Sequence, residues 1–346
     1  MKIKARSCIP GAPVPGWRNG NRAHCLGRAA WLLVGLLTLE LAAENQAGPA
    51  VFIPQWKHQA QFAGYYAALD QGFFTRRGLD VKILCGGPDQ PAARMVADGR
   101  ADFGTLFLAD AIGQRARGLP LVNIAQVVQR SSLMLVARKS SGIRAPSDLA
   151  GRKVSLWADF RVQPEALFRQ FGIAPRIVNQ GATINLFLRG GVDAASAMWY
   201  NEYHLLLNAG LDADELTVFF YDAYGLNFPE DGIYCRAETL RDHPARCRAF
   251  VQAALEGWRY AFAHPEAALD MVMRHMSAPD YAANRAHQRW MLARMRDIIL
   301  PADRPAELGV LQPEDFRRVA EALQARGMIA AAPAWTDFYA NCAKPE

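Results

Sequence analysis

Aromatic and amide side chains are concentrated just after the first apolar run of the chain. Trp56 is followed by the amides Gln59 and Gln61. Tyr65 and Tyr66 come next, where the spacing predicts a helix. A flat ring could stack on the aromatic groups while the amides bind its polar edge, because ligand pockets combine apolar walls with a few polar groups. The two tyrosines fit equally well as core residues of an amphipathic helix.

Two later apolar runs also end in candidate ligand contacts. Gly86 and Gly87 would let backbone amides approach a ligand, or would simply make a tight turn. Thr105 lies near the end of the next run, and Asp110 follows it at the start of a predicted helix. A carboxylate at that place could bind a ligand, although it also favours the helix dipole.

The middle of the chain repeats this arrangement with a different set of groups. Trp199, Asn201 and Glu202 offer a stacking ring, an amide and a carboxylate together, which suits an amine-bearing heterocycle. Glu202 would otherwise be a solvated residue in the first turn of a helix. The segment 227–231, with Asn227 as its candidate ligand contact, precedes a later strand and is expected at the mouth of the same site.

A further candidate segment contains Trp157, Asp159 and Arg161, again between an apolar run and a helical stretch. No motif of a known catalytic class accompanies these groups. The seven histidines lack the HExxH spacing, and neither a GxSxG nor a Walker phrase occurs in the sequence. We therefore expect a binding site without catalytic residues, cofactor or metal.

The elements that position these groups alternate between short apolar runs and helical periodicity, which predicts βα units and mainly parallel sheets, an α/β fold. The predicted strands are 50–54, 79–84, 103–107, 121–128, 133–137, 154–157, 176–179 and 194–198. The predicted helices of this part are 61–73, 91–98, 109–117, 163–170, 184–188 and 200–208. From residue 237 onward the chain is mostly helical, with candidates at 244–262, 265–275, 280–297 and 313–325.

The length of 346 residues favours two compact units. Residues 50–137 together with 236–346 are predicted to form lobe 1, and residues 138–235 to form lobe 2. The absence of a low-complexity linker indicates short hinge strands between the lobes. Ligands of open α/β sheets lie beyond the carboxyl ends of the strands, so the candidate groups should meet in a cleft between the lobes.

The first 43 residues are predicted to be an export signal. Six Lys and Arg residues precede Glu40, an apolar run covers 29–39, and Ala42-Ala43 makes a small-residue exit. We therefore expect a periplasmic protein whose mature N-terminus lies between Ala43 and Gly48. An uncleaved signal that anchors the chain in the inner membrane is the alternative.

The excess of basic side chains, 39 against 33 acidic, comes almost entirely from this signal. The mature chain is thus nearly neutral, which argues against nucleic acid as a partner. Four of the six cysteines lie beyond the signal, and three full pairings among them are possible. A disulfide between Cys235 and Cys247 is the pairing we expect, because the two flank a short turn and helix start.

Several phrases in fixed order carry a family resemblance. Residues 70–81 read DQGFFTRRGLDV, a helix end followed by a turn and a strand entry. The later phrases are GRADFG at 99–104, ARG at 116–118, DLAGRKV at 148–154 and GVDA at 191–194. In these features the chain resembles a family that contains periplasmic sulfonate, nitrate and pyrimidine receptors of the SsuA type together with fungal thiamine-pyrimidine synthases.

This resemblance implies a type-II periplasmic-binding fold of two α/β lobes with the ligand cleft between them. It further implies a monomeric receptor that takes a thiamine-pyrimidine precursor-like heterocycle or a sulfonate-type solute to the permease and ATPase of an ABC importer. In phosphate-binding relatives a glycine-containing loop occupies the segment 157–161. The glycines are missing here, and Arg161 is the group that could replace them.

The synthase branch of the family is the main alternative, and a sensory module for a membrane partner is a second one. Synthases build the pyrimidine from their own histidine and pyridoxal phosphate, with iron. In the gap-free match from Trp56 to Gly118 their lysine falls on Leu106 and their histidine on Asp110. Their cysteine-rich run should lie just before the strand that ends at Cys235, where residues 227–232 contain no cysteine. Without the lysine and histidine neither a Schiff base nor a nitrogen donor is available. We therefore expect a receptor rather than an enzyme.

Overall fold

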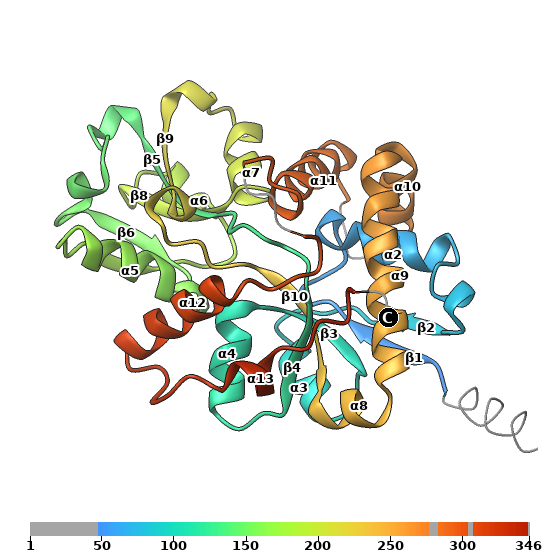
Figure 1. Ribbon diagram of the computed structural model, residues 1–346. Coiled ribbons are helices and arrows are strands. Elements are labelled where there is room, and N and C mark those ends of the chain that lie inside the picture. The colour runs from blue at the N-terminus through green and yellow to red at the C-terminus, as the bar shows by residue number, and fades with distance from the viewer. Residues whose placement is uncertain (1–47, 277–282, 304–306, 345–346) are drawn as a thin grey trace, which may run out of the picture. The chain divides into compact units, whose positions relative to one another are not determined.

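Two mixed five-stranded sheets organise the chain (Figure 1). The computed structural model describes residues 48–276, 283–303 and 307–344, so the predicted export signal lies outside the described residues. The sheets are covered by helices, which confirms the predicted α/β class. None of the described helices combines the length and apolar character that crossing a membrane requires.

The first sheet has the strand order β2-β1-β3-β10-β4. Its strands are β1 (Ala50–Ile53), β2 (Val81–Ile83), β3 (Phe103–Phe107), β4 (Leu121–Gln126) and β10 (Asp231–Arg236). β1 pairs in parallel with β2 and β3, whereas β10 runs antiparallel to β3 and β4. The carboxyl ends of β1 and β3 therefore lie at the same edge of the sheet as the start of β10.

The second sheet has the order β7-β6-β8-β5-β9. Its strands are β5 (Leu133–Arg138), β6 (Lys153–Leu156), β7 (Arg176–Asn179), β8 (Ala194–Met198) and β9 (Leu216–Phe220). β6 pairs in parallel with β7 and β8, while β5 runs antiparallel to β8 and β9. The sequence did not lead us to expect β9, an aromatic-rich strand that pairs only through β5.

Helices enclose both sheets. In chain order they are α2 (Ala63–Asp70), α3 (Ala92–Ala97), α4 (Leu108–Ala116), α5 (Val162–Gln170), α6 (Asn185–Leu188), α7 (Glu202–Asn208), α8 (Ala237–Asp242), α9 (Pro244–Ala263), α10 (Pro265–His275), α11 (Arg285–Ile299), α12 (Pro313–Ala325) and α13 (Trp335–Phe338). Short 3-10 helices include Ala60–Phe62, Ala158–Phe160 and Tyr221–Tyr224. The predicted helix 61–73 is thus a 3-10 turn followed by a shorter α-helix.

The lobe boundaries differ from those predicted. We expected lobe 1 to end at Ala137 and to resume after Cys235. In the structure β5 belongs to the second sheet and β10 to the first, so the chain crosses between the sheets in segments 127–132 and 221–230. β5 and β10 are both largely buried, so their sequence pattern could not show which sheet each would join.

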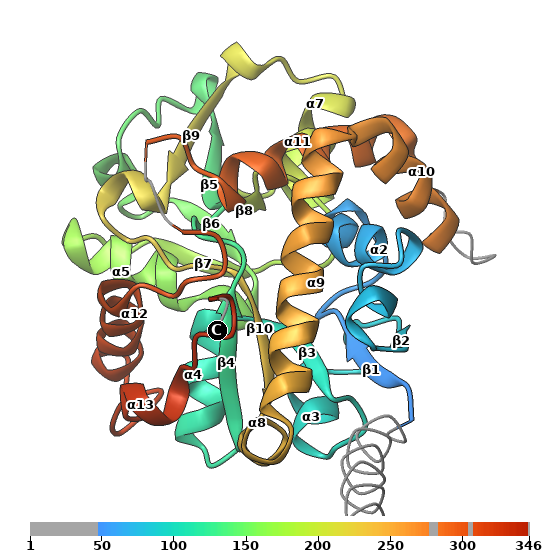
Figure 2. The same cartoon turned by 45° about the vertical axis from the view of Figure 1, so that its right-hand side comes forward.

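The C-terminal helices connect the two lobes as well. α9 and α10 pack against α2 in lobe 1, and α11 packs on the 3-10 turn before α2 while also reaching α7 of lobe 2. α12 lies between α4 of lobe 1 and α5 of lobe 2, as both cartoon views show (Figure 2). An ion pair between Arg326 and Glu165 joins α12 to α5.

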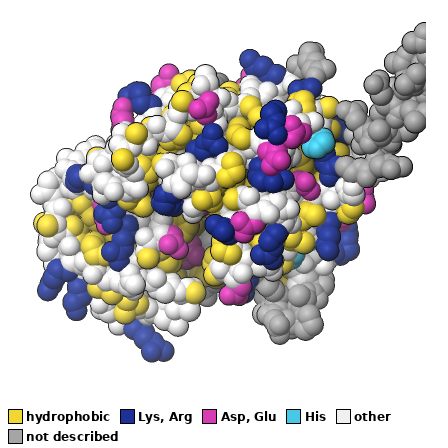
Figure 3. Space-filling view, turned by 90° about the horizontal axis from the view of Figure 1, so that it is seen from below, with side chains coloured by type: hydrophobic (Ala, Val, Ile, Leu, Met, Phe, Trp, Pro, Cys, Tyr) yellow, Lys and Arg dark blue, Asp and Glu magenta, His cyan; other side chains and the backbone are white. Residues whose placement is uncertain are grey.

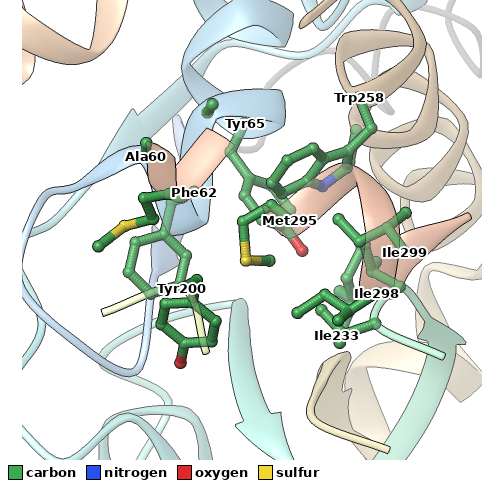
Figure 4. Packing of buried hydrophobic residues seen from close by; sticks show 14 of the residues in the cluster. Ala60, Phe62, Tyr65, Tyr200, Ile233, Trp258, Met295, Ile298 and Ile299 are labelled. Atoms are coloured by element: carbon green, nitrogen blue, oxygen red, sulfur yellow. The ribbon is translucent and has the colours of Figure 1, made fainter. Parts of the chain in front are cut away.

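The close contact of α2 with α9 depends on two glycines. A Cβ atom at Gly257 would lie 2.0 Å from the carbonyl oxygen of Gly64, and one at Gly64 would lie 2.3 Å from the ring of Trp258. Trp258 packs edge-on against Tyr65 at 5.9 Å between ring centroids. The cluster in Figure 4 shows both rings among buried residues from lobe 1, β8–α7 and α11.

Candidate ligand-binding cleft

A pocket lies between the two lobes where β3, β6 and both crossing segments end. Its empty space of about 440 Å³ includes open solvent, so the lobes must move apart before a small organic molecule can enter between them. Lobe 1 contributes the end of β3 and the start of α4, and lobe 2 the start of α5. The lining residues are Phe107, Ala109, Asp110, Ser131, Leu133, Asp159, Phe160, Val162, Gln163, Phe228, Pro229 and Glu230.

The walls of this pocket are aromatic. Phe107 from lobe 1 and Phe160 from lobe 2 face each other with ring centroids 5.2 Å apart and a 53° angle between the planes. Phe228 adds a third ring from the second crossing segment. A flat ligand entering between the lobes would thus find apolar surface contributed by both.

The polar groups of the pocket are mainly acidic. Asp110, Asp159 and Glu230 line it, and Lys and Arg are absent from its lining as far as the described residues define it. Elsewhere, on the face shown in Figure 3, basic and acidic side chains are interspersed. The pocket lining is therefore acidic, whereas the face in Figure 3 carries both signs of charge.

Asp110 and Asp159 approach each other from opposite lobes. Burial raises the pKa of Asp110, and the charge of Asp159 raises this pKa further, although the amide of Gln114 and the charge of Arg117 act against the rise. Both aspartates stand at the solvent-exposed mouth of the pocket. Two like charges at this place favour a cationic or amino group between them over an anion.

Glu230 forms the buried floor of the pocket. Its carboxylate accepts hydrogen bonds from the backbone amide of Ser132 at 2.5 Å and from the Ser132 hydroxyl at 3.2 Å. Burial is the main cause that raises its pKa to about 8, and the neighbouring Asp231 adds to the rise. This carboxyl is thus largely protonated at neutral pH.

The next residue, Asp231, belongs to a second polar cluster behind the floor. One of its oxygens accepts a hydrogen bond from the side-chain amide of Gln55, and the other accepts one from Gln61 at 2.6 Å. The amide of Gln59 in turn donates to the Gln61 oxygen at 2.6 Å. Burial raises the pKa of Asp231 to about 7, while the two glutamine bonds oppose the rise.

Two tyrosines adjoin this cluster from different lobes. Tyr65 of α2 is fully buried, and its hydroxyl has no hydrogen-bond acceptor among the described residues, although the Trp258 indole lies near its oxygen. Tyr200 follows β8 in lobe 2 and is also buried. Burial raises the pKa of both phenols, and the charge of Asp231 raises each of them further.

The predicted ligand residues are divided between these two places. Asp110 and Asp159 line the pocket. Gln59, Gln61 and Tyr65 instead surround Asp231. Two more predicted residues bind backbone amides of the protein. Thr105 accepts a hydrogen bond from the Gln55 amide within lobe 1 at 2.9 Å, and Asn227 accepts one from the Ser131 amide, between the crossing segments, at 2.9 Å.

Other predicted residues of the first lobe lie outside the pocket. Trp56 has 42% of its surface exposed and does not contact the lining. Tyr66 is buried and stacks on His275 at 4.4 Å, so the core interpretation of this residue agrees with the structure. Gly86 packs where a Cβ atom would lie 1.8 Å from the Pro54 carbonyl oxygen, and Gly87 has a φ of 134°, so both glycines are required by backbone geometry.

The predicted residues of the second lobe are likewise engaged with the protein itself. The Trp157 indole donates to the Gly181 carbonyl at 3.1 Å, and Arg161 donates to the Asn179 amide oxygen at 2.7 Å. The guanidinium of Arg294 lies 4.7 Å from the centre of the Trp199 ring.

Glu202 and Asn201 connect β8 to α7 and α11. The Glu202 carboxylate accepts hydrogen bonds from the Met198 backbone amide at 3.0 Å and from the Asn201 side chain at 2.8 Å. Asn201 also bonds His287 of α11 at 2.9 Å. Burial raises the pKa of Glu202, so this residue is neither solvated nor a pocket residue as the structure stands.

The expected disulfide between Cys235 and Cys247 is not formed. All four described cysteines are free thiols, and the two lie close enough for a thiol–thiol hydrogen bond that raises the pKa of Cys235. Contact alone does not meet the torsional requirements of a disulfide. Within the described residues, groups of three or more metal-ligating side chains that could hold an ion are also lacking.

Sequence reasoning missed most of the pocket lining. Phe107, Phe160 and Phe228 lie within the candidate segments that the sequence indicates, but they are not among the residues predicted to contact the ligand. Glu230 was noticed only as part of a segment before the last strand. The one available signal was the pair of consecutive carboxyls ahead of an apolar strand, since such a pair is costly to bury without a purpose.

The chain matches one family model and is similar in sequence to several known proteins. The family model described as NMT1/THI5 like matches residues 59–268. The 4-amino-5-hydroxymethyl-2-methylpyrimidine phosphate synthase THI13 of Saccharomyces cerevisiae is 23% identical over 230 residues, which cover 62% of this chain and 67% of that protein. The formylaminopyrimidine-binding protein of Halalkalibacterium halodurans is 23% identical over 238 residues, covering 65% and 70% respectively.

Among solved structures, the periplasmic aliphatic sulphonate binding protein SsuA from Escherichia coli is similar with a TM-score of 0.66. The sequence identity is 15%, and the match covers 84% of this chain and 92% of that one. At this identity the likeness concerns the fold alone, and it confirms the predicted two-lobed periplasmic-binding architecture.

Proposed function

The chain belongs to the NMT1/THI5-like family, and from this premise we propose that it is a solute-binding receptor for a small amine-bearing heterocycle. The observation that carries the proposal is the pocket between the lobes, where phenylalanine rings from both sides meet three carboxyl groups. The lobes close on the solute about the two crossing segments, in the manner of a hinge. The receptor then delivers its solute to the permease and ATPase of an ABC importer.

The chemistry of the pocket supports an aminopyrimidine over a sulfonate. Ring faces of Phe107 and Phe160 suit a flat heterocycle, and carboxyl groups accept hydrogen bonds from its amino group. A sulfonate would bring a negative charge close to Asp110 and Asp159, which disfavours it electrostatically. The names of the two relatives above, a pyrimidine synthase and a pyrimidine-binding protein, agree with this choice of solute.

A synthase activity is less well supported by the residues. Leu106, at the position of the synthase lysine, is buried in β3 and offers no amine for a Schiff base. Asp110, at the position of the synthase histidine, lines the pocket but carries no nitrogen to donate. We therefore propose transport-linked binding rather than pyrimidine synthesis.

Export to the periplasm is part of the proposal, because an ABC importer collects its solute there. Cleavage of the N-terminal segment would release a mature chain that begins between Ala43 and Gly48. Mass spectrometry of the protein recovered from the periplasmic fraction tests this, and recovery of intact Met1 in the membrane fraction would contradict it.

Calorimetric titration tests the choice of solute. We expect 4-amino-5-hydroxymethyl-2-methylpyrimidine to bind with a Kd of about 1 μM or lower, as a preformed aromatic pocket with paired polar groups allows. Ethanesulfonate should bind at least about 100-fold more weakly, because like-charge contacts cost several kcal/mol. Tighter binding of the sulfonate, or no binding of the pyrimidine, would reject this function.

A further inference from the structure

Asp231 and the two glutamines that bind it resemble a ligand site occupied by the protein itself. We propose that Asp231 recognises the amino group of the solute. When no solute is bound, the side-chain amides of Gln55 and Gln61 donate to the Asp231 carboxylate in place of that amino group. This inference rests on the proposed function and adds to it a specific recognition residue. It also assigns a purpose to a buried carboxyl that lies behind the floor of the pocket.

The hydrogen bonds of Asp231 have the right chemistry for such an exchange. Each glutamine presents an NH₂ group to a different carboxylate oxygen, with the Gln61 bond at 2.6 Å. The exocyclic amine of an aminopyrimidine offers an N–H donor of the same kind to a carboxylate oxygen, and its neighbouring ring nitrogen accepts a hydrogen bond from a protonated carboxyl. The glutamine amides are neutral, and none of the ion pairs among the described residues includes Asp231. A neutral solute amine would therefore replace a neutral glutamine amide as the hydrogen-bond donor to Asp231.

The contrast with Glu230 shows why Asp231 is the residue available for exchange. Glu230 is held by the backbone amide of Ser132, a donor that is fixed by the fold. Asp231 is held by side chains, and Gln55 lies in a bend while Gln61 lies in the 3-10 turn Ala60–Phe62. Rotation of these side chains frees the carboxylate without breaking a sheet or a long helix.

An unused donor beside Asp231 points independently to a ligand. The Tyr65 hydroxyl is fully buried and has no acceptor for its own hydrogen among the described residues, although the Trp258 indole lies near enough to donate to its oxygen. Its phenol is close enough to Asp231 for the carboxylate charge to raise its pKa. Buried polar atoms are rarely left unpaired unless a ligand or water completes them. In Figure 4 the Tyr65 ring points from α2 toward the space between Met295 and Ile233 of β10.

Lobe 2 supplies the cover of this site. Tyr200 stands at the end of β8, buried and close enough to Glu230 and Asp231 for both charges to raise its pKa. When the lobes separate, Tyr200 leaves with lobe 2 while Asp231 and its glutamines remain with lobe 1. The solute thus meets Asp231 in the open form, and closure places the tyrosine over it.

The experiment compares two probes that differ only in the amino group. These are 4-amino-5-hydroxymethyl-2-methylpyrimidine and 5-hydroxymethyl-2-methylpyrimidine, titrated calorimetrically into the exported protein. Asp231→Asn should weaken the amino probe at least about 10-fold and the other probe less than about 3-fold, since a charge-assisted hydrogen bond is lost for one of them only. Equal weakening of both probes would overturn the proposal.

Gln61→Met provides a result that a merely structural role would not give. Removing the competing amide should tighten binding of the amino probe by about 3- to 10-fold, because the solute no longer has to displace it. Weaker binding would show that Gln61 itself contacts the solute, and would overturn the proposal. This variant keeps the carboxylate, so it decides the matter even if Asp231→Asn fails to fold.

Gln129→Met is the matched control. Gln129 is an equally buried glutamine, but its amide donates only to the backbone carbonyls of Gln126 and Val310. Its loss should lower the melting temperature and leave both probe affinities unchanged. If the wild type binds neither probe, the proposed function fails as a whole. If it binds the amino probe and Asp231→Asn keeps the same preference, this inference alone fails.

Discussion

Glu230 ends the second crossing segment and Asp231 begins β10, and the protein holds these two consecutive residues in opposite ways. Glu230 faces the pocket, and its carboxylate accepts hydrogen bonds from the backbone amide and the hydroxyl of Ser132, the last residue of the other crossing segment. Asp231 faces the interior of lobe 1 and is bound by two glutamine side chains. Adjacent residues of an extended chain point to opposite sides, so one short segment supplies a carboxyl to each place.

We infer from this difference that the Glu230 carboxyl supports the fold and that the Asp231 carboxyl is suited to binding. The bond from the Ser132 backbone amide to Glu230 joins the two crossing segments, because Ser132 immediately precedes β5. Bonds to side-chain amides can be exchanged without moving these segments. We therefore expect Glu230 to matter most for stability and Asp231 most for recognition, and the following experiments test that division.

The largest effect should follow from removing the Glu230 carboxyl. Glu230→Ala leaves the Ser132 amide and hydroxyl without a partner in a buried place, which should lower the free energy of unfolding by about 3 kcal/mol. Urea denaturation of the protein without solute measures this loss. Asp231→Ala frees only side-chain amides that can turn to other partners, so it should cost less. A larger loss for Asp231→Ala would reverse the assignment.

The pH dependence of stability should follow next in size. Folding raises the pKa of Glu230 to about 8 and that of Asp231 to about 7, so the folded protein holds protons that the unfolded chain has released. Their contribution to stability is therefore full below the ordinary carboxyl pKa of about 4, falls as the pH rises to the raised values, and levels off above them. Between pH 6.5 and 8.5 these two groups should lower the free energy of unfolding by about 3 kcal/mol.

The histidines act in the opposite direction at the start of this range. Burial lowers the pKa of His58, His204 and His287, the last to about 4, whereas histidines of the unfolded chain are still half protonated at pH 6.5. Their contribution therefore raises stability up to about pH 7.5 and offsets part of the decrease there. Glu230→Gln should remove the larger part of the decrease, because the group with the higher pKa titrates within this range. A slope that is unchanged in Glu230→Gln would show that other groups cause it.

The smallest effect should come from the exposed mouth of the pocket. Asp110→Asn and Asp159→Asn should each weaken binding of 4-amino-5-hydroxymethyl-2-methylpyrimidine by only about 3- to 10-fold, since charges near solvent are screened. The melting temperature should stay the same or rise slightly, because a repulsion between the lobes is removed. Calorimetry at low and high salt measures both. A loss as large as that of Asp231→Asn would place recognition at the mouth instead.

Several parts of the fold followed directly from local sequence patterns. The helices 265–275 and 313–325 and the strands 176–179 and 194–198 have the predicted bounds. Proline starts both helices, Pro175 directly precedes the first strand, and Gly190-Gly191 makes a turn shortly before the second. β9 was missed. Its apolar residues 216–220 gain their strand structure from pairing with β5, and a pairing between distant segments leaves no local signal.

The sequence by itself determined the class of elements, their order and the family phrases that imply two lobes. It also located the loops after the strands, and so named Asp110 and Asp159, which line the pocket. Only the tertiary structure decided how those loops are used. Trp56 stays at the surface, Tyr66 enters the core, and Glu202 binds the protein itself, because neighbours from distant segments fix the direction of each side chain.

The crossing segments show the same limit most clearly. A pair of consecutive carboxyls is visible in the sequence, but the partners of Glu230 and Asp231 lie about 100 and 170 residues away along the chain. Whether a buried carboxyl meets a backbone amide or a glutamine depends on which strands pair. The packing of the whole chain decides which strands pair. It therefore also decides that Glu230 supports the fold while Asp231 is suited to binding.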